Sequence, residues 1–523
     1  MRGAHISAIV VSGSILLAVA PGTLAAAPGT TAVRAPAPVV VRTGPDVVNV
    51  GTGAPSRPLP RGFVGVSLEY NTVTAYEGTS TKESNPVLAQ LIRNLAPGQT
   101  PILRIAGDST DWTWWPIRGV RRPPGASNSL TPTWLLRAHT LAQATKARLI
   151  LGINLEANST RIASVEANQL VNGIGRRSIG ALEVGNEPQL YPILPWYKTT
   201  TGAWRFGRPI NYSLADYASE FASYAAVLPN LPLAGPAIGH SWLSQLVGFI
   251  KAARRLRLVT FHSYAINSTG AAFRGRNCST ATSDPAHPTP ATLLAPFASQ
   301  GLMREADPAI ALTHSRHMAF RVDEMNAVTC AGTPGVSDTF ASALWVLNAL
   351  FAMDRAGVDG VNIHSWRGSA GKLFGFSLDH GTWSASVRPE YYGLEMFARA
   401  APAGSTLEPV TQTNGTNVEA WATMARDHRL RVMLINHSLT AAQSVLVRAP
   451  AARGSAVLDR LRAPSVQSTT GMTLAGQSFG AATTTGALAG PLREPTLKRR
   501  GGAYSVRLPA DTATLLTARS TTG

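Results

Sequence analysis

Short apolar runs alternate with longer amphipathic stretches from Gly62 to about Arg399. Eight of the short runs have the length of a strand: Phe63–Glu69, Ile102–Ala106, Leu149–Asn154, Ile179–Gly185, Leu233–Gly235, Val259–Tyr264, Ala319–Asp323 and Gly360–His364. They are nearly continuous in apolar residues, which is typical of parallel strands covered by helices. The intervening stretches are expected to supply those helices.

Helical periodicity is clearest in the stretch before the last of these strands. There Phe340, Leu344, Leu347 and Phe351 recur at steps of three or four, forming the stripe of a helix packed on a sheet. Helices are predicted at Pro86–Leu95, Pro132–Thr145, Leu214–Leu228, Trp242–Ala253 and Asp338–Ala356. Eight strand–helix repeats in about 340 residues predict an α/β fold, the (β/α)8 TIM barrel. An open doubly wound sheet is the alternative, but no glycine-rich nucleotide-binding turn follows any strand.

The pattern changes after Arg399, where short strand-like runs are separated by Gly, Pro, Ser and Thr. These runs are Val418–Ala422, Leu430–Ile435, Ser444–Val447, Ala456–Leu458 and Ala513–Thr517. They predict an additional C-terminal all-β domain, a β-sandwich, over residues 400–523, after a catalytic barrel over residues 61–399. Residues 28–60 are predicted to be a linker, with one candidate strand of the β-domain at Val39–Val41.

The amino terminus has the pattern of an export signal. Met1 and Arg2 precede an apolar stretch from Ile6 to Ala20 that is too short to span a bilayer, and small residues follow up to Ala27. Residues 1–27 are therefore predicted to be a secretory signal peptide, with an uncleaved membrane anchor as the alternative. No later segment has the roughly 18 uninterrupted apolar residues of a membrane span. We expect a secreted, extracellular protein without a membrane span after cleavage.

The chain is strongly basic. Lys and Arg number 47 against 29 Asp and Glu, a net charge of +18, while 45% hydrophobic residues exclude wholesale disorder. A basic surface suits phosphate, acidic lipid or acidic carbohydrate, although an arginine-biased composition gives the same number. The basic residues are scattered, with Lys498-Arg499-Arg500 as the longest run, and exported proteins rarely meet nucleic acid. We therefore expect no nucleic-acid partner.

Two glutamates lie where predicted strands reach the loop face of the barrel. Glu187 ends the fourth strand segment, and Glu324 ends the seventh. Chemistry sits at the carboxyl ends of barrel strands, and strands four and seven lie across the barrel mouth. Two facing carboxyls suit glycoside hydrolysis, because one can protonate the leaving oxygen while the other attacks the anomeric carbon. If the two carboxyls stand about 5 to 5.5 Å apart, the reaction retains the configuration of the anomeric carbon. The alternative is that both glutamates are surface loop residues without a catalytic role.

These glutamates, with Asn186, resemble those of the clan of retaining glycosidases on (β/α)8 barrels. Within it, five motifs resemble glycoside hydrolase family 79, the β-glucuronidase and heparanase-like family: Phe63-Val64-Gly65-Val66-Ser67-Leu68-Glu69-Tyr70, Leu103-Arg104-Ile105-Ala106-Gly107-Asp108-Ser109, Asp323-Glu324-Met325-Asn326, Val387-Arg388-Pro389-Glu390-Tyr391-Tyr392-Gly393 and, in the β-domain, Gly471-Met472-Thr473-Leu474. The resemblance spans roughly residues 60–520. It implies Glu187 as acid/base, Glu324 as nucleophile and Asn186 as the partner of the sugar 2-hydroxyl.

Four further residues are candidates for contact with the substrate. Tyr264 ends the sixth strand and is placed to reach Glu324 or a sugar carboxylate, unless it only lines the barrel. Trp366 follows the eighth strand and offers a flat apolar face for a sugar ring, with core packing as the alternative. Arg104 on the second strand and Asp108 after it are expected either to support the glutamates or to bind the sugar.

The chain has two cysteines, Cys278 and Cys330, in the loops after strands six and seven. In an oxidising compartment they are a candidate disulfide, with two separate thiols as the alternative. Their number excludes a disulfide-rich scaffold and a multi-cysteine zinc module, and the histidines lack zinc spacing, so no metal or cofactor is expected. The residues that bind a uronic carboxylate stay unassigned, and the loop 327–332 is the natural place for them.

The sequence therefore predicts a secreted retaining glycoside hydrolase that cleaves β-glucuronic acid linkages by double displacement with two glutamates. The alternatives are a β-xylosidase, glucosidase or arabinofuranosidase of the same clan, and a non-catalytic protein that binds acidic polysaccharide. A Gly-x-Ser-x-Gly string begins at Gly476, but it lies in the β-rich tail rather than in a strand–turn–helix, which argues against a serine hydrolase. The exact sugar, exo or endo action and the oligomeric state are left open.

Overall fold

The computed structural model describes residues 45–51, 53–266, 287–413 and 417–521. The predicted signal peptide, the candidate strand at Val39–Val41 and Cys278 lie outside these residues. Within the described ranges, no helix combines the length and the hydropathy that crossing a bilayer requires.

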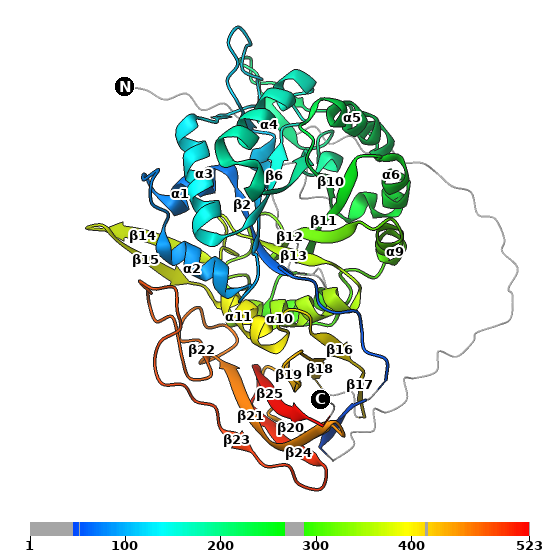
Figure 1. Ribbon diagram of the computed structural model, residues 1–523, viewed down its shortest axis with the longest axis vertical. Helices are drawn as coiled ribbons and strands as arrows, with labels where there is room; N and C mark the ends of the chain where they lie inside the picture. Colours follow the sequence, from blue (N-terminus) through cyan, green and yellow to red (C-terminus); the bar gives the residue numbers. More distant parts are fainter. Residues whose placement is uncertain (1–44, 52, 267–286, 414–416, 522–523) are drawn as a thin grey trace, which may run out of the picture. The chain divides into compact units, whose positions relative to one another are not determined.

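Eight parallel strands close into a barrel, as the alternating pattern predicted (Figure 1). In spatial order they are β2 (Val64–Glu69), β3 (Ile102–Ala106), β6 (Arg148–Ile153), β7 (Ile179–Val184), β10 (Leu233–Ile238), β11 (Leu256–Ile266), β12 (Ala319–Val328) and β13 (Gly360–His364). The last strand pairs with the first, with Val361 opposite Val64, and this closes the ring. The predicted barrel is confirmed, and each of the eight apolar runs contributes one strand.

Helices cover the outside of the barrel between successive strands (Figure 1). They are α1 (Tyr70–Glu77), α2 (Pro86–Asn94), α3 (Pro132–Thr145), α4 (Thr160–Ile174), α5 (Leu214–Val227), α6 (Leu246–Ala252), α7 (Pro290–Leu293), α8 (Phe297–Gln300), α9 (Asp307–Ser315), α10 (Phe340–Arg355) and α11 (Pro389–Ala400). Capping side chains define several of their first residues. At α5 the Ser213 hydroxyl accepts from the backbone N–H of Asp216, whose carboxylate accepts from that of Ser213 in return.

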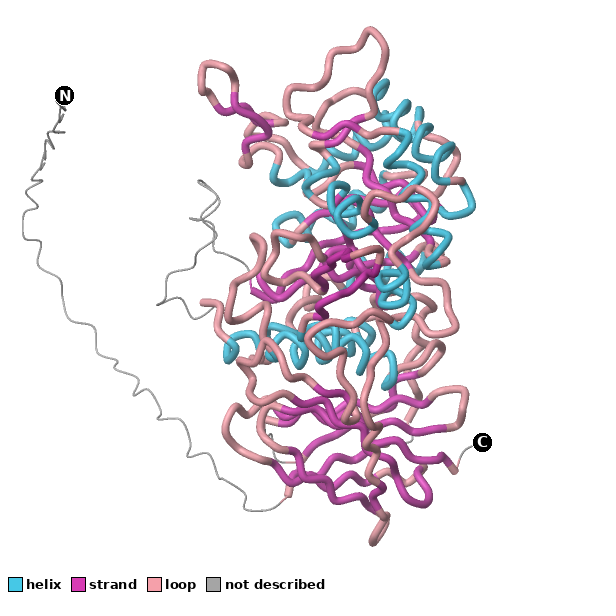
Figure 2. Tube along the Cα trace, turned by 90° about the vertical axis from the view of Figure 1, so that its left-hand side faces the viewer, coloured by secondary structure: helices cyan, strands magenta, loops and turns pink. Residues whose placement is uncertain are grey.

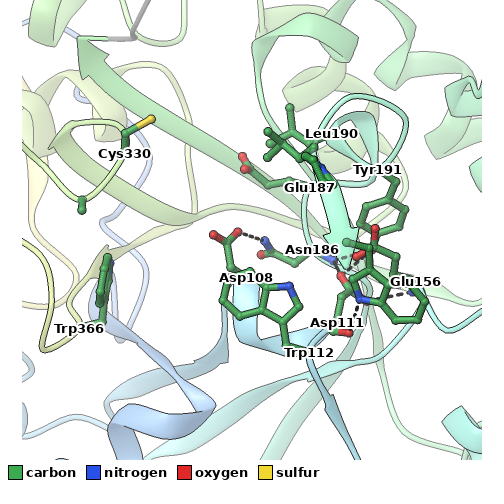
Figure 3. A pocket seen from close by; sticks show the side chains of 14 residues that line it. Asp108, Asp111, Trp112, Glu156, Asn186, Glu187, Leu190, Tyr191, Cys330 and Trp366 are labelled. Carbon is green, nitrogen blue, oxygen red and sulfur yellow. Dashed lines mark hydrogen bonds between the residues drawn. The ribbon is translucent and has the colours of Figure 1, made fainter. Parts of the chain in front are cut away.

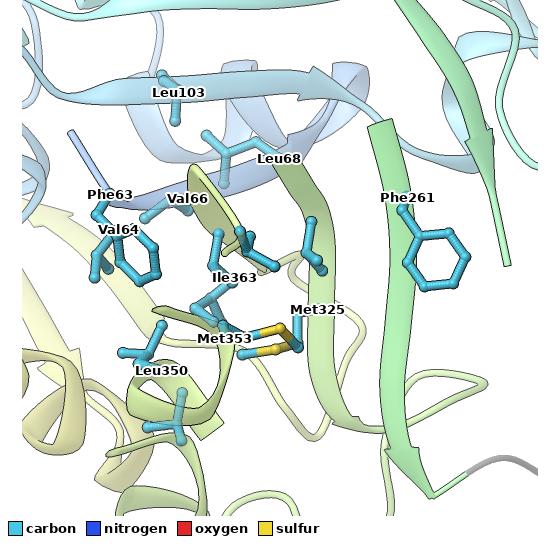
Figure 4. Close-up of a cluster of buried hydrophobic side chains, with 14 of the residues drawn as sticks. Phe63, Val64, Val66, Leu68, Leu103, Phe261, Met325, Leu350, Met353 and Ile363 are labelled. Atoms are coloured by element: carbon cyan, nitrogen blue, oxygen red, sulfur yellow. The ribbon is translucent and has the colours of Figure 1, made fainter. Parts of the chain in front are cut away.

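Helix α10 is buried on every side, although its sequence predicted a single apolar stripe. All residues from Phe340 to Asp354 are buried. On one side Leu350 shares a cluster with Ile363 of β13 (Figure 4). On another, Phe351 stacks on Trp421 of the β-domain, with ring centroids 5.5 Å apart. The stripe underestimated the buried surface, because the second domain covers a face that would otherwise meet solvent.

The carboxy-terminal domain consists of two sheets (Figure 2). The larger contains β16 (Thr406–Glu408), β18 (Val418–Met424), β19 (Arg429–Asn436), β25 (Thr512–Ser520), β21 (Ala452–Arg462) and β22 (Thr473–Leu474), with β23 (Thr496–Leu497) beside β21. The smaller contains β17 (Val410–Gln412), β1 (Asp46–Val50), β20 (Gln443–Arg448) and β24 (Ala503–Leu508). Apolar side chains of both sheets, such as Val48, Leu434 and Val447, form one core. The predicted all-β domain is confirmed, and the amino-terminal segment adds β1 to it.

The barrel and the β-domain share a continuous core. Trp421 and Met433 of the β-domain belong to the same apolar cluster as the barrel strands. The indole Nε1 of Trp421 donates to Oδ1 of Asn348 on α10 at 2.8 Å, and the backbone N–H of Phe340 donates to the carbonyl of Ser468 at 2.9 Å. The β-domain therefore contributes to the packing that holds the barrel.

Strand β12 is longer than its sequence predicted and is irregular near its centre. The apolar pattern ended this strand at Asp323, with Glu324 beyond it, but β12 continues to Val328. Its pairing with β11 shifts by one position between Val322 and Glu324, so that Asp323 is an extra residue. Such a bulge re-aims side chains. As a result, both Asp323 and Glu324 reach Arg104 inside the barrel.

Candidate active site

Two cavities that share several lining residues lie at the carboxyl ends of the barrel strands, and Figure 3 shows the smaller of them. The larger has a volume of about 530 Å³ and is lined by both Glu187 and Glu324. The smaller, of about 320 Å³, is lined by Glu187 but does not reach Glu324. Asp108, Trp112 and Trp366 line both cavities. They are two lobes of one site, called the larger lobe and the smaller lobe below.

Glu187 stands on a sharp turn that follows β7. Gly185 has a φ of +75° and Glu187 itself a φ of +48°, a left-handed conformation that is uncommon for glutamate. The backbone N–H of Glu187 donates to the carbonyl of Ala237 at 2.9 Å and holds this turn. The carboxyl oxygen Oε1 lies 3.1 Å from Nδ1 of His262, and 21% of the side chain is exposed. The carboxyl is therefore fixed in direction yet accessible from both lobes.

Glu324 lies deeper, with 8% of its side chain exposed. Arg104 donates to its Oε2 at 2.8 Å, and the Tyr264 hydroxyl donates to its Oε1 at 2.7 Å. Burial alone would raise the pKa of Glu324, but the charges of His364, His262 and Arg104 and the bond from Tyr264 outweigh it. They hold the pKa well below its usual value, so the carboxylate is ionised at neutral pH.

Arg104 forms the centre of a buried network beneath the two lobes. Its fully buried guanidinium donates through Nε to Glu183 at 2.7 Å and through Nη2 to Oδ1 of Asn186 at 2.8 Å. Nε also lies 3.0 Å from Oδ2 of Asp323. Arg104 is absent from the residues that line the two lobes. Of the two roles that the sequence left open, its burial fits the support of Glu324.

Three carboxyls surround this one guanidinium, and they do not all carry charge. Burial, followed by the charge of Glu183, raises the pKa of Asp323 well above its usual value. For Glu183, burial acts in the same direction, but Arg104 and a hydrogen bond with Asp323 outweigh it and lower the pKa. Asp323 therefore keeps its proton, and the arginine faces two carboxylates, those of Glu183 and Glu324.

Asn186 and Asp108 meet at the boundary between the lobes (Figure 3). Asn186 accepts from Arg104 through Oδ1 and donates through Nδ2 to Oδ1 of Asp108 at 3.4 Å, which fixes the orientation of its amide. Asp108 is exposed to the cavity, yet enclosure by the surrounding protein and the charges of Glu69 and Glu187 raise its pKa well above the usual value. A protonated Asp108 both donates to and accepts from a sugar hydroxyl.

Residues that the sequence did not point to also line the site, among them Glu69, His262 and His364. His364 places Nε2 at 3.3 Å from Glu69 and Nδ1 at 3.8 Å from Glu324. Burial would lower the pKa of His364, but Glu324 and Glu69 raise it overall. Glu69 and His364 end strands β2 and β13, and His262 lies within β11. The rule that charged residues at strand ends are candidates would have found Glu69 and His364 if it had been applied to every strand.

Tyr264 and Trp366 lie at the site that their positions predicted. The Tyr264 hydroxyl bonds Glu324, the first of the two partners proposed for it. Trp366 is half-buried and lines both lobes (Figure 3). Cys330 also lines both lobes. The candidate disulfide involves Cys278, which lies outside the described residues, and so it stays a prediction.

Across the described ranges, no group of three or more His, Cys, Asp or Glu side chains is arranged to hold a metal ion. Three histidines line the larger lobe. His262 lies beside the carboxyl of Glu187 and His364 beside that of Glu69, whereas His240 lies 3.3 Å from the Ser263 hydroxyl.

The β-domain matches a known protein family. Residues 420–515 match the family described as "Glycosyl hydrolase family 79 C-terminal beta domain". The predicted resemblance to family 79 is confirmed. No curated protein matches the chain by sequence.

Solved glycosidase structures share the barrel with its β-domain. A 4-O-α-L-rhamnosyl-β-D-glucuronidase from Fusarium oxysporum 12S, solved with Rha-GlcA, has a TM-score of 0.69 at 19% identity, covering 90% of this chain and 100% of that one. The GH51 arabinofuranosidase of Xanthomonas axonopodis pv. citri has a TM-score of 0.64 at 15% identity, covering 91% and 100%. An α-L-arabinofuranosidase of Thermotoga maritima has a TM-score of 0.61 at 12% identity, covering 90% and 99%. These likenesses show the fold, and with the family 79 domain they support a glycoside hydrolase.

Proposed function

We propose that the chain is a retaining β-glucuronidase with Glu187 as acid/base and Glu324 as nucleophile. The observation that carries the proposal is the position of His262, whose Nδ1 lies 3.1 Å from Oε1 of Glu187 and 3.9 Å from Oε1 of Glu324. Since both distances start at one atom, the two carboxyl oxygens are at most about 7 Å apart. Retaining enzymes separate their carboxyls by about 5 to 5.5 Å and inverting enzymes by about 6.5 to 9.5 Å, so this limit favours retention.

In the first step the Glu187 carboxyl gives its proton to the glycosidic oxygen while the Glu324 carboxylate attacks the anomeric carbon. The bond from C1 to the leaving oxygen breaks, the alcohol departs, and an ester joins C1 to Glu324. The bonds from Arg104 and Tyr264 keep Glu324 ionised for this attack. The greater exposure of Glu187 suits a group that exchanges its proton with the leaving group and with water.

In the second step Glu187, now a carboxylate, takes a proton from a water molecule whose oxygen attacks C1. The ester bond breaks and Glu324 leaves as a carboxylate, so that two inversions give overall retention. The Nδ2 group of Asn186, whose orientation Arg104 fixes, donates to the sugar 2-hydroxyl. This bond strengthens as positive charge develops on the ring in the transition state.

Glucuronic acid as the glycone is supported by the family 79 domain and by the similar glucuronidase structure. We assign the uronic carboxylate to the loop 329–332, where Cys330 and Ala331 line both lobes and the backbone N–H groups suit an anion. His364, with its raised pKa, adds positive charge in the larger lobe. The net charge of +18 favours the approach of an acidic glycan.

A panel of chromogenic substrates tests this proposal. We expect an aryl β-D-glucuronide to be cleaved with a kcat/KM at least roughly tenfold above those of the β-D-glucoside, β-D-xyloside and α-L-arabinofuranoside. Proton NMR should show the β-anomer of glucuronic acid as the first product. Cleavage of the other glycosides without cleavage of the glucuronide would place the specificity elsewhere in the clan. The α-anomer as first product would contradict retention.

We also propose that the protein is exported with residues 1–27 as its signal peptide. The support is the pattern of a short positive start, an apolar stretch and small residues up to Ala27. Amino-terminal sequencing of protein from the medium of cells that express the full chain is expected to start near Pro28. Recovery of the chain in the membrane fraction with Met1 still attached would instead support an anchor.

A further inference from the structure

The smaller lobe (Figure 3) does not reach the nucleophile, and part of its lining, which includes Asp111, Glu156 and Trp196, is not shared with the larger lobe. Trp112 and Trp196 form aromatic walls, and Leu194 and Pro195 add apolar surface. Glu156 lines the same lobe with only 7% of the residue exposed. This lobe has a volume of about 320 Å³ and does not reach Glu324.

Asp111 connects this lobe to the catalytic residues. Its Oδ1 accepts from the backbone N–H of Glu156 at 3.0 Å, its Oδ2 from that of Asn186 at 3.1 Å, and its carbonyl from Nε1 of Trp196 at 3.0 Å. Behind the wall, Gly125 lies so close to the Trp196 ring that a Cβ there would stand 2.2 Å from it. The buried Asp111 and the close contact of Gly125 with Trp196 therefore fix the position of the lobe's wall relative to Asn186, which precedes the acid/base.

The polar groups of the smaller lobe suit a neutral ligand. The charged residue types in its lining are all acidic, Asp108, Asp111, Glu156 and Glu187, in contrast to the basic chain as a whole. Burial, followed by the charge of Asp111, raises the pKa of Glu156 to about 10. The protonated carboxyl both donates and accepts hydrogen bonds, which matches a sugar hydroxyl. A second uronic acid would instead bring a negative charge into a lobe whose described lining has no Lys, Arg or His to pair with it.

The position of Asn186 indicates how such a ligand is joined to the substrate. Asn186, assigned above to the 2-hydroxyl, lines the smaller lobe, and Asp108 lies between the lobes. The ring hydroxyls of the glucuronic acid therefore face the smaller lobe. The 2-hydroxyl itself must stay free to bind Asn186, which leaves the 3- and 4-hydroxyls as points of attachment.

We propose that the smaller lobe binds a neutral sugar joined to the 3- or 4-hydroxyl of the glucuronic acid, so that the enzyme releases a capped disaccharide. This inference rests on the β-glucuronidase function proposed above. The indole rings of Trp112 and Trp196 pack on the apolar faces of the second sugar, and Glu156 binds its hydroxyls.

Three aryl glycosides with the same leaving group test the inference: the bare β-D-glucuronide and its 3-O- and 4-O-α-L-rhamnosyl derivatives. In the wild type we expect kcat/KM for one capped substrate to exceed that for the bare one at least roughly tenfold, with a disaccharide as the released sugar. Glu156→Leu and Trp196→Ala should each lower this ratio roughly tenfold. Glu156→Gln keeps a donor and an acceptor and should retain most of it.

The matched control is Trp204→Ala, because Trp204 lies on β9 (Trp204–Phe206), is 50% exposed and lines neither lobe. It should leave the ratio unchanged, and thermal melting verifies that each variant is folded. Equal kcat/KM for all three substrates, or a ratio that survives both Glu156→Leu and Trp196→Ala, would overturn the inference but not the β-glucuronidase function. Failure to hydrolyse any of the three would overturn the proposed function itself.

Discussion

The two glutamates differ, as single residues, in what surrounds them: Glu324 is held by two donors in the barrel, whereas Glu187 is open to the pocket. Replacing Glu324 by Gln keeps the shape but removes the nucleophile. We expect kcat on an aryl β-D-glucuronide to fall at least roughly a thousandfold. Glu83→Gln, at an exposed glutamate that lines neither lobe, is the control and should leave kcat unchanged. Full activity in the Glu324 variant would reject its role.

The hydroxyl of Tyr264 affects the protonation of the nucleophile. It donates to Glu324 at 2.7 Å and is one of the influences that lower the pKa of that carboxyl. In Tyr264→Phe the pKa of Glu324 should rise, so that the carboxylate becomes protonated at a higher pH than in the wild type. We expect the acidic limb of the kcat/KM profile to move to higher pH, with Tyr197→Phe as the control. A lower rate with an unmoved acidic limb would show that Tyr264 acts only by position.

The local sequence identifies some residues of the candidate site but not others. Glu187 and Glu324 follow apolar runs, so their place at the barrel mouth comes from local sequence. Asp323 and Glu156 carry no such signal, because their protonation depends on burial beside carboxyls that are distant in the chain. The role of Arg104 depends likewise on its partners, which come from strands β7 and β12.

At the scale of elements, the turn after β7 places the acid/base. Gly185 has a φ of +75°, and a Cβ there would stand 2.7 Å from the Tyr191 hydroxyl. Gly185→Ala should therefore displace the turn and lower kcat/KM at least roughly tenfold, besides a backbone cost of about 1 kcal/mol. Gly98→Ala is the matched control, since Gly98 has a φ of +67° but no atom within 4 Å of the added Cβ. It should show a similar loss of stability with unchanged kcat/KM.

The elements themselves were largely predictable, while their irregularities were not. Eight apolar runs gave eight barrel strands because each strand is buried on both faces and reads as continuous apolar sequence. The bulge in β12 has no signature of this kind, since it shows only as a shift of pairing with β11. The burial of α10 on all sides was also missed, because its polar Asn348 faces the β-domain and bonds Trp421.

At the scale of the whole molecule, the shared core predicts that the barrel and the β-domain unfold together. Trp421 stacks on Phe351, bonds Asn348 and is 5% exposed. Trp421→Ala should lower the free energy of unfolding by roughly 3–5 kcal/mol. Trp204→Ala, at an exposed tryptophan, should change it by less than about 0.5 kcal/mol. Circular dichroism and activity should be lost at one urea midpoint, and two separate midpoints would contradict a common core.

The stability of the whole molecule should also depend on pH through carboxyls that are buried in neutral form. Glu390, in the first turn of α11, is 1% exposed, and neither of its carboxyl oxygens has a hydrogen-bond partner in the part of the chain that the structure describes. Burial raises its pKa well above the usual value of 4.5. The folded chain therefore keeps a proton that the unfolded chain releases, and each such group destabilises the fold by about 1.4 kcal/mol per pH unit above that value.

Replacing Glu390 by Gln removes this proton from the balance while preserving the size of the side chain. From pH 5 to pH 8 the variant should lose less free energy of unfolding than the wild type, as measured by urea titration at both pH values. Glu77, whose pKa burial raises to about 7, is unchanged in both proteins and adds the same dependence to each. Glu83→Gln should follow the wild type at both pH values. Parallel losses in Glu390→Gln and the wild type would mean that Glu390 is ionised in the folded chain, in conflict with its burial.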